Sequence, residues 1–172
     1  MQRWLIALLS VLSLLGVSGN VLPRNTIVSL SLVQRYFPQV VRQLSAGRNS
    51  TAVGHPTATL SVIYVNSDGS KKVTLTIDRY ATTSAAHSAY TLALQKSRIP
   101  GFKPVTVPRF GQQSFAGTVT RGHETHVGLG SLQGALIVGA TIAGYSATRS
   151  TIANLTALAR AESSLAKAAL TL

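Results

Sequence analysis

The chain has 172 residues, contains no cysteine, and carries 16 lysines and arginines against 4 aspartates and glutamates, a formal net charge of +12 at pH 7. The absence of cysteine excludes disulfides, thiolate metal sites, thiol nucleophiles and a cysteine-linked lipid. The positive charge predicts attraction to anionic partners such as phospholipid head groups, cell-wall polymers or nucleic acid. The basic residues are spread along the chain without an arginine-rich helix or an aromatic stacking motif, so we do not expect a nucleic-acid partner.

Residues 1–19 have the pattern of a secretory signal peptide. Arg3 precedes an apolar run over residues 4–17, and the run is followed by the small residues Ser18 and Gly19, which a signal peptidase reads. The run is shorter than the roughly 20 residues that a helix needs to cross a bilayer, so we expect cleavage after Gly19, with retention as an anchor as the alternative. Export without disulfides is typical of a bacterial envelope, which predicts a periplasmic or secreted protein with no transmembrane segment after cleavage.

The segment 20–56 is predicted to be helical and to end in a loop. Apolar residues recur at three- and four-residue spacing over residues 25–46. Because Pro38 cannot donate a hydrogen bond to the preceding turn, we expect one short helix that ends near Tyr36 and a second that begins at Pro38. Residues 48–56 are polar, contain glycine and proline, and show no period, which predicts the loop.

A β-hairpin is the clearest local prediction in the chain. Residues 59–65 and 72–80 are rich in β-branched and aromatic side chains, and they alternate with a period of two. Between them, Asp68 and Gly69 readily supply the positive φ angles that a tight hairpin turn needs. We therefore expect two paired strands, with one face of the second strand packed and the other in water.

The second half of the chain is predicted to form helix, sheet and helix. An alanine-rich stripe predicts a helix that ends near Ser97, and the proline-rich residues 99–108 predict an extended connection. Apolar and polar residues then alternate through a three-strand meander, and a last amphipathic helix begins after Ser146 or Thr148. The predicted strands of the meander are residues 114–120, 123–129 and 135–142.

These elements predict an α+β fold for one domain over residues 20–172. Its main part, residues 57–172, would hold about five mostly antiparallel strands, the hairpin plus the three-strand meander, covered by helices. Residues 20–56 would add the helical segment and loop in front of it. We find no internal repeat and no low-complexity tract.

The order of elements over residues 57–160 resembles that of a known family. The hairpin ends in DGSKKVTLTIDRY and leads into an alanine-rich helix; a Pro-Gly linker then reaches a Phe-Gly-Gln turn, and a strand pair ends in GALIVGATIAGY before a closing helix. This layout resembles the PsbP-like fold of the photosystem II extrinsic P subunit and of bacterial envelope lipoproteins. The resemblance implies a non-catalytic binding or accessory protein on the outer side of a membrane. It carries no functional residue over, and the chain lacks the lipobox cysteine of the lipoprotein members.

The candidate ligand-binding residues are His123, Glu124 and His126, together with the cations Arg109 and Arg121. Imidazole and carboxylate groups suit zinc or copper. On a strand, however, Glu124 and His126 point to one face and His123 to the other, so the three meet at one ion only if the turn after Arg121 bends His123 round. The alternative is a polar strand face on which Glu124 pairs with a nearby arginine.

The sequence favours a function in binding. It contains no phosphate-binding loop, no dinucleotide turn and no nucleophile elbow. Only four carboxylates are present, one of them in the hairpin turn, which argues against the paired carboxylates of a glycosidase. We therefore expect a non-catalytic, exported binding or accessory protein of the bacterial envelope, without a cofactor, whose partner is an anionic envelope component or another envelope protein. The alternatives are a periplasmic protein that binds a metal or small ligand through His123, Glu124 and His126, and an envelope hydrolase with a dispersed site.

Overall fold

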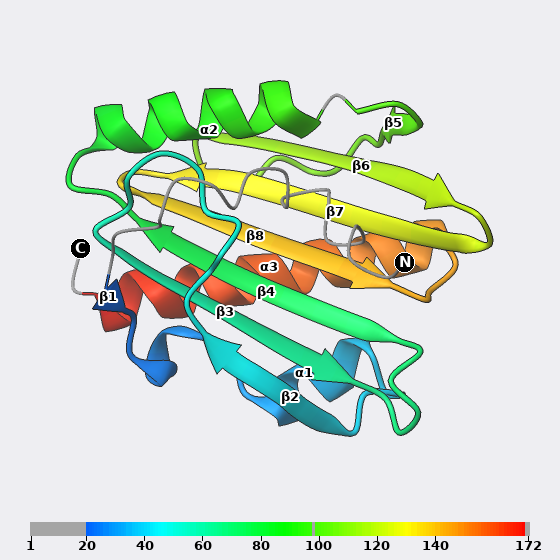
Figure 1. Ribbon diagram of the computed structural model, residues 1–172. Helices are drawn as coiled ribbons and strands as arrows, with labels where there is room; N and C mark the ends of the chain where they lie inside the picture. Colours follow the sequence, from blue (N-terminus) through cyan, green and yellow to red (C-terminus); the bar gives the residue numbers. More distant parts are fainter. Residues whose placement is uncertain (1–19, 98, 171–172) are drawn as a thin grey trace.

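A computed structural model describes residues 20–97 and 99–170 of the chain. The predicted signal peptide, residues 1–19, lies outside the described residues. The described chain folds into one sheet of eight strands with three α-helices and a short 3-10 helix (Figure 1). In chain order the elements are β1 (Asn20–Val21), η1 (Arg24–Thr26), α1 (Leu30–Tyr36), β2 (Arg42–Gly47), β3 (Ala58–Val65), β4 (Lys72–Arg79), α2 (Thr83–Ser97), β5 (Phe102–Pro104), β6 (Gln113–Arg121), β7 (Glu124–Gln133), β8 (Leu136–Ala143) and α3 (Arg149–Ala169).

The strands lie in the order β1-β3-β4-β8-β7-β6-β5, and β2 pairs with the same edge of β3 as β1. Among the strands that the structure describes, only the pair β1–β3 is parallel. The antiparallel pair β4–β8 joins the predicted hairpin to the predicted meander, with Lys72 opposite Ala143 and Arg79 opposite Leu136. Through this pair, connections that are far apart in the sequence meet at one end of the sheet.

The class α+β is as predicted, but the five-stranded sheet is wrong, because the described chain forms eight strands. The additional strands β1, β2 and β5 are short and lie at the two edges of the sheet. Backbone hydrogen bonds to an edge strand hold each of them in the sheet. Their side chains therefore do not need to alternate between buried and exposed positions. The sheet in Figure 1 is therefore wider than the hairpin and meander alone.

The predicted helix that would begin at Pro38 is also wrong, whereas the predicted helix before it is present. Helix α1 ends at Tyr36, and the Ser29 hydroxyl caps it by accepting a hydrogen bond from Leu32 N–H at 3.4 Å. After Pro38 the chain forms β2 instead of a helix. Leu44, which contributed to the helical spacing, is 53% exposed, so the apolar period there does not reflect a buried face. Pairing with the free edge of β3 decides the conformation of this segment.

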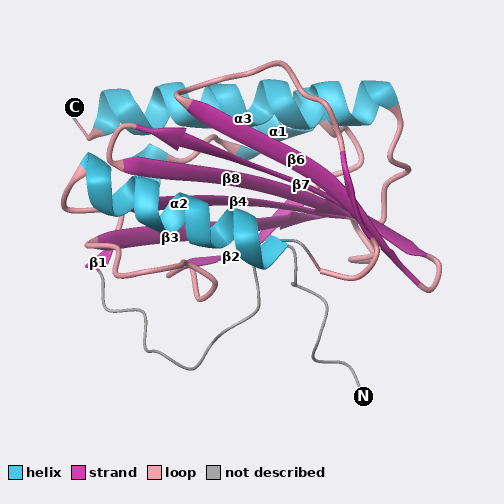
Figure 2. Cartoon of the chain, turned by 90° about the horizontal axis from the view of Figure 1, so that it is seen from above, coloured by secondary structure: helices cyan, strands magenta, loops and turns pink. Residues whose placement is uncertain are grey.

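The sheet has a packed layer on each side. Figure 2 shows α3 and α1 on one side and α2 on the other. Under α3, the side chains Val73, Leu75 and Ile77 of β4 are fully buried, as the alternation predicted. Each contributes roughly 1.5–3 kcal/mol of burial free energy relative to an exposed position. A smaller cluster under α2 contains Tyr90, Leu132 and Ile137.

Part of the face predicted to meet water is covered. On that face of β4, Lys72 is exposed and Thr74 is half-buried, but Thr76 and Asp78 are each only 6% exposed. The connection from β2 to β3, residues 48–57, passes over this region, as the cyan loop in Figure 1 shows. We call this connection the β2–β3 loop.

Candidate functional site

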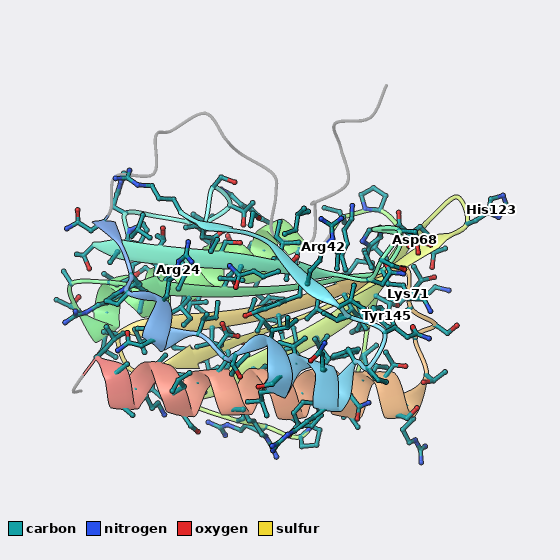
Figure 3. The ribbon with its side chains drawn as sticks, turned by 90° about the horizontal axis from the view of Figure 1, so that it is seen from below. Arg24, Arg42, Asp68, Lys71, His123 and Tyr145 are labelled. Carbon is teal, nitrogen blue, oxygen red and sulfur yellow. The ribbon has the colours of Figure 1, made fainter. Side chains whose placement is uncertain are left out.

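A pocket of about 430 Å³ opens at the end of the sheet where three connections meet. These connections are the β3–β4 turn, the β6–β7 turn and the loop from β8 to α3. Figure 3 shows Asp68, Lys71, His123 and Tyr145 gathered at this end of the molecule, with Arg24 toward the other end. We call this cavity the hairpin-end pocket, and its lining residues are Ser70, His123, Glu124, Thr125, Gly144, Tyr145 and Ser146.

Close backbone contact between Gly144 and Ser70 fixes one wall of the hairpin-end pocket. Gly144 has a φ of +77°, which favours glycine, and a Cβ atom there would lie 2.1 Å from the Ser70 carbonyl oxygen. The Ser70 hydroxyl accepts a hydrogen bond from Asn66 Nδ2 at 3.1 Å, and the Ser70 N–H donates to Asp68 at 2.8 Å. Hydrogen bonds from Ser70 lower the pKa of the Asp68 carboxyl. The β3–β4 turn is thus held firmly against the β8–α3 loop.

Tyr145 forms the aromatic side of the pocket. Its ring meets Phe37 edge to face, with 5.2 Å between the ring centroids, and Lys71 Nζ lies 5.5 Å from its centroid. The Tyr145 hydroxyl is buried and has no hydrogen-bond partner among the described residues, and burial raises its pKa. The Tyr145 ring is therefore held by Phe37 and Lys71, while its hydroxyl group lacks a hydrogen-bond partner among the described residues.

The structure brings three of the predicted candidates together on one hairpin. Glu124 and His126 lie on the same face of β7, as the strand period predicted, with Glu124 Oε2 3.5 Å from His126 Nε2. His123 lies in the turn and lines the pocket with Glu124. The backbone of Arg121 pairs with Glu124. Arg109 precedes the opposite end of β6, where its guanidinium donates to the Gln112 carbonyl.

The geometry around these residues does not favour a metal site. Within residues 20–97 and 99–170, no group of three or more histidines, aspartates and glutamates is close enough to hold a metal ion together. The Glu124 carboxylate contacts the His126 imidazole, and its predicted pairing with an arginine stays a prediction. What the pocket offers instead is hydroxyl, imidazole and carboxylate groups on a rigid frame.

Sequence reasoning missed Ser70 and Ser146 as lining residues. Ser70 was assigned only to a turn, and Ser146 only to the start of the last helix. They meet His123 and Glu124 because β8 lies between β4 and β7 in the sheet. This neighbour relation carries no local sequence signal, since it depends on pairing between distant strands.

A second polar cluster lies buried under the β2–β3 loop. The Asn49 side-chain amide donates to both carboxylate oxygens of Asp78 at 2.9 Å, and the Asn49 N–H donates to the Thr59 hydroxyl at 3.1 Å. The Tyr80 hydroxyl donates to the Val53 carbonyl of the same loop at 2.6 Å. Burial raises the pKa of Asp78 to about 7, although the Asn49 hydrogen bonds oppose the shift.

Glu162 lies on α3 and is buried on the other side of the sheet. Its side chain is fully buried, and both carboxyl oxygens lack a hydrogen-bond partner among the described residues. Burial raises the pKa of Glu162 well above its usual range. Two of the four acidic side chains, Asp78 and Glu162, are thus withdrawn from the surface with raised pKa values.

Comparisons with known proteins give a structural likeness but no family. No family model matches the sequence, and no match was found among curated proteins. Among solved structures, the crystal structure of the extracellular domain of PknH from Mycobacterium tuberculosis is similar over 86% of this chain and 94% of that chain, with 10% sequence identity and a TM-score of 0.49. The helices in the described part of the chain do not combine the length and apolar composition that crossing a membrane requires. The PsbP-like resemblance stays a prediction.

Proposed function

We propose that this protein is an exported, non-catalytic binding protein of the bacterial envelope that associates with anionic polymers through its basic surface. The observation that carries the proposal is the distribution of charge. The two acidic side chains that are not buried, Asp68 and Glu124, both lie at the pocket end of the sheet. Elsewhere on the described surface the charged side chains are lysines and arginines. The signal-peptide pattern of residues 1–19 supports export.

The basic side chains surround the molecule instead of gathering on one side. Arg35 on α1 and Arg160 on α3 are exposed on one face of the sheet. Arg42 is exposed on the β2 edge and Lys103 on the β5 edge, and Lys96 lies on α2 on the other face. A flat lipid surface would meet only one of these sides, whereas a flexible polymer can reach several at once. This arrangement favours an anionic polymer over a membrane as the partner.

Binding of this kind is the sum of many weak contacts. An exposed ion pair contributes roughly 0–1 kcal/mol, so no single lysine or arginine is expected to dominate. Attraction between exposed charges is also screened over about 10 Å at 0.1 M salt. We therefore expect avid binding only to polymers that carry repeated negative charges.

The proposal is tested by comparing binding to carboxymethyl dextran and to uncharged dextran at low salt. These polymers share one backbone and differ in charge. We expect retention on the carboxylated polymer alone, and stronger retention there than on vesicles of anionic lipid. Equal retention on both dextrans, or none on either, would contradict the proposed function. Preference for the vesicles would contradict the choice of a polymer as the partner.

A further inference from the structure

The hairpin-end pocket displays hydrogen-bonding groups of both kinds. Hydroxyl groups from the β3–β4 turn, from β7 and from the β8–α3 loop both donate and accept hydrogen bonds, and the Glu124 carboxylate accepts them. In a neutral His123 imidazole, one nitrogen donates and the other accepts. The hydroxyl-bearing residues that line the pocket are Ser70, Thr125, Tyr145 and Ser146. A ligand that fits this lining must itself carry several groups that donate and accept.

Two hydroxyl groups of the lining are held by neighbouring side chains before any ligand arrives. The Ser70 hydroxyl is held by hydrogen bonds with Asn66 and Asp68. The bond from Asn66 occupies one lone pair of the Ser70 oxygen, and the second lone pair can accept a hydrogen bond from a ligand. The Thr125 hydroxyl is 3.1 Å from that of Thr120 across the β6–β7 pair. A pocket with such restrained side chains loses little conformational entropy when it binds.

One wall of the pocket has an unmet hydrogen-bonding group. The Tyr145 hydroxyl is buried without a partner among the described residues. Most buried polar atoms in native proteins have a partner, so this exception calls for an explanation such as a bound group. Tyr145 lines the pocket, where a bound polar molecule would supply the missing partner.

The charges around the pocket give no net preference for an ion of either sign. Glu124 lines the pocket and Lys71 lies over the Tyr145 ring, so their opposite charges counteract each other on a charged ligand. A volume of about 430 Å³ falls within the range of small-ligand sites, roughly 300–1,000 Å³. An uncharged molecule with many hydroxyl groups meets each of these requirements. In a bacterial envelope, the sugar units of glycans have this chemistry.

We propose that the hairpin-end pocket is a saccharide site that takes one uncharged sugar unit of an envelope glycan. The inference deepens the proposed function, and it rests on that function for the source of the ligand. The basic surface would attract the polymer at long range. The pocket would recognise a sugar unit through short hydrogen bonds, which salt screens far less.

The test is an NMR titration of the protein with the N-acetylglucosamine disaccharide and with cellobiose, in 0.5 M salt. We expect saturable shifts of the backbone amides of residues 70, 123–125 and 144–146 with at least one of the two sugars. Tyr145→Phe and Glu124→Gln should each weaken binding about fivefold to tenfold, which corresponds to one lost hydrogen bond. Ser164→Ala, on the exposed side of α3, is the matched control and should bind as the wild type does.

Absence of saturable shifts at these amides with both sugars, shifts confined to another surface, or unchanged affinity in both pocket variants would overturn the inference. Tyr145→Phe keeps the ring packing and Glu124→Gln keeps the side-chain shape, so the amide spectra of the free variants verify their folds. If the protein binds carboxymethyl dextran but neither sugar, only the saccharide site fails. If a sugar binds in the pocket but carboxymethyl dextran is not retained at low salt, the proposed function fails.

Discussion

The Asn49 side-chain amide lies 2.9 Å from each carboxylate oxygen of Asp78 and so fastens the β2–β3 loop to the end of β4. Asp78 is 6% exposed, and burial raises the pKa of its carboxyl to about 7. The loop is therefore anchored by a hydrogen-bonded carboxyl that changes charge near neutral pH. The loop also packs on α2, because a Cβ atom on Gly54 would lie 3.3 Å from Ala89 Cβ.

Asp78→Asn should reduce the pH dependence of stability. The folded pKa of about 7 exceeds the ordinary value of 3.8, so the stability associated with this group is complete below pH 3.8 and is lost as pH rises through about 7. Between pH 5 and pH 8 we expect the free energy of unfolding of the wild type to fall by about 2–3 kcal/mol on account of Asp78. Urea denaturation at both pH values measures the difference. An equally steep fall in the variant would contradict this assignment.

Asn49→Ala should destabilise the protein more at high pH than at low pH. Removing the amide leaves the Asp78 carboxyl buried without its donor, which costs about 2–4 kcal/mol when the carboxyl is ionised and less when it is neutral. Thr51→Ala is the control, because the Thr51 hydroxyl donates to Asn49 Oδ1 at 2.7 Å and does not touch Asp78. Thr51→Ala should lower the free energy of unfolding by a smaller amount, and that amount should not vary with pH. Equal pH dependence in the two variants would count against the carboxyl as the cause.

Glu162→Gln should stabilise the protein at high pH. The glutamine keeps the shape of the side chain but cannot ionise, whereas burial raises the pKa of the wild-type carboxyl well above its usual range. Stability tied to Glu162 is complete below its unfolded pKa of about 4.5 and is lost as pH rises through the folded value. Thermal unfolding should show a small difference at pH 5 and a growing advantage for the variant toward pH 9. A constant difference over this range would disprove the interpretation.

Gly144→Ala should disturb the hairpin-end pocket. The new Cβ atom would meet the Ser70 carbonyl oxygen at 2.1 Å in addition to the strain of a φ of +77°, so we expect a loss of about 2–4 kcal/mol. Gly69→Ala is a matched control, because Gly69 has a φ of +75° and open space around its Cβ position. It should lose only about 1 kcal/mol. If both variants lose the same free energy, the contact between the two connections does not hold the pocket together.

The local parts of the fold could be predicted from the sequence. Asp68 and Gly69 predicted the hairpin turn, and Gly69 has the positive φ that such turns need. Alternation predicted the buried face of β4, and the break at Pro38 predicted the end of α1 near Tyr36. In each case the signal lies within a few residues of the element that it specifies.

The remaining features depend on partners far away in the chain. Strand β2 forms because β3 has a free edge, although Leu44 and its neighbours are exposed. The hydrogen-bond partner of Asp78, Asn49, lies 29 residues earlier in the chain. The local cluster of His123 and Glu124 was visible in the sequence, whereas its meeting with Tyr145 requires β8 to lie beside β4 and β7. Strand pairing across such distances leaves no short-range pattern to read.

The salt dependence of binding to carboxymethyl dextran tests the central claim most directly. If the basic surface binds anionic polymers, the logarithm of the association constant should fall steeply and linearly with the logarithm of salt concentration, because each contact releases a bound counterion. We predict a loss of at least about tenfold between 50 mM and 200 mM salt, with a slope that corresponds to several simultaneous contacts. An affinity that does not change with salt, or that is the same for uncharged dextran, would contradict the account.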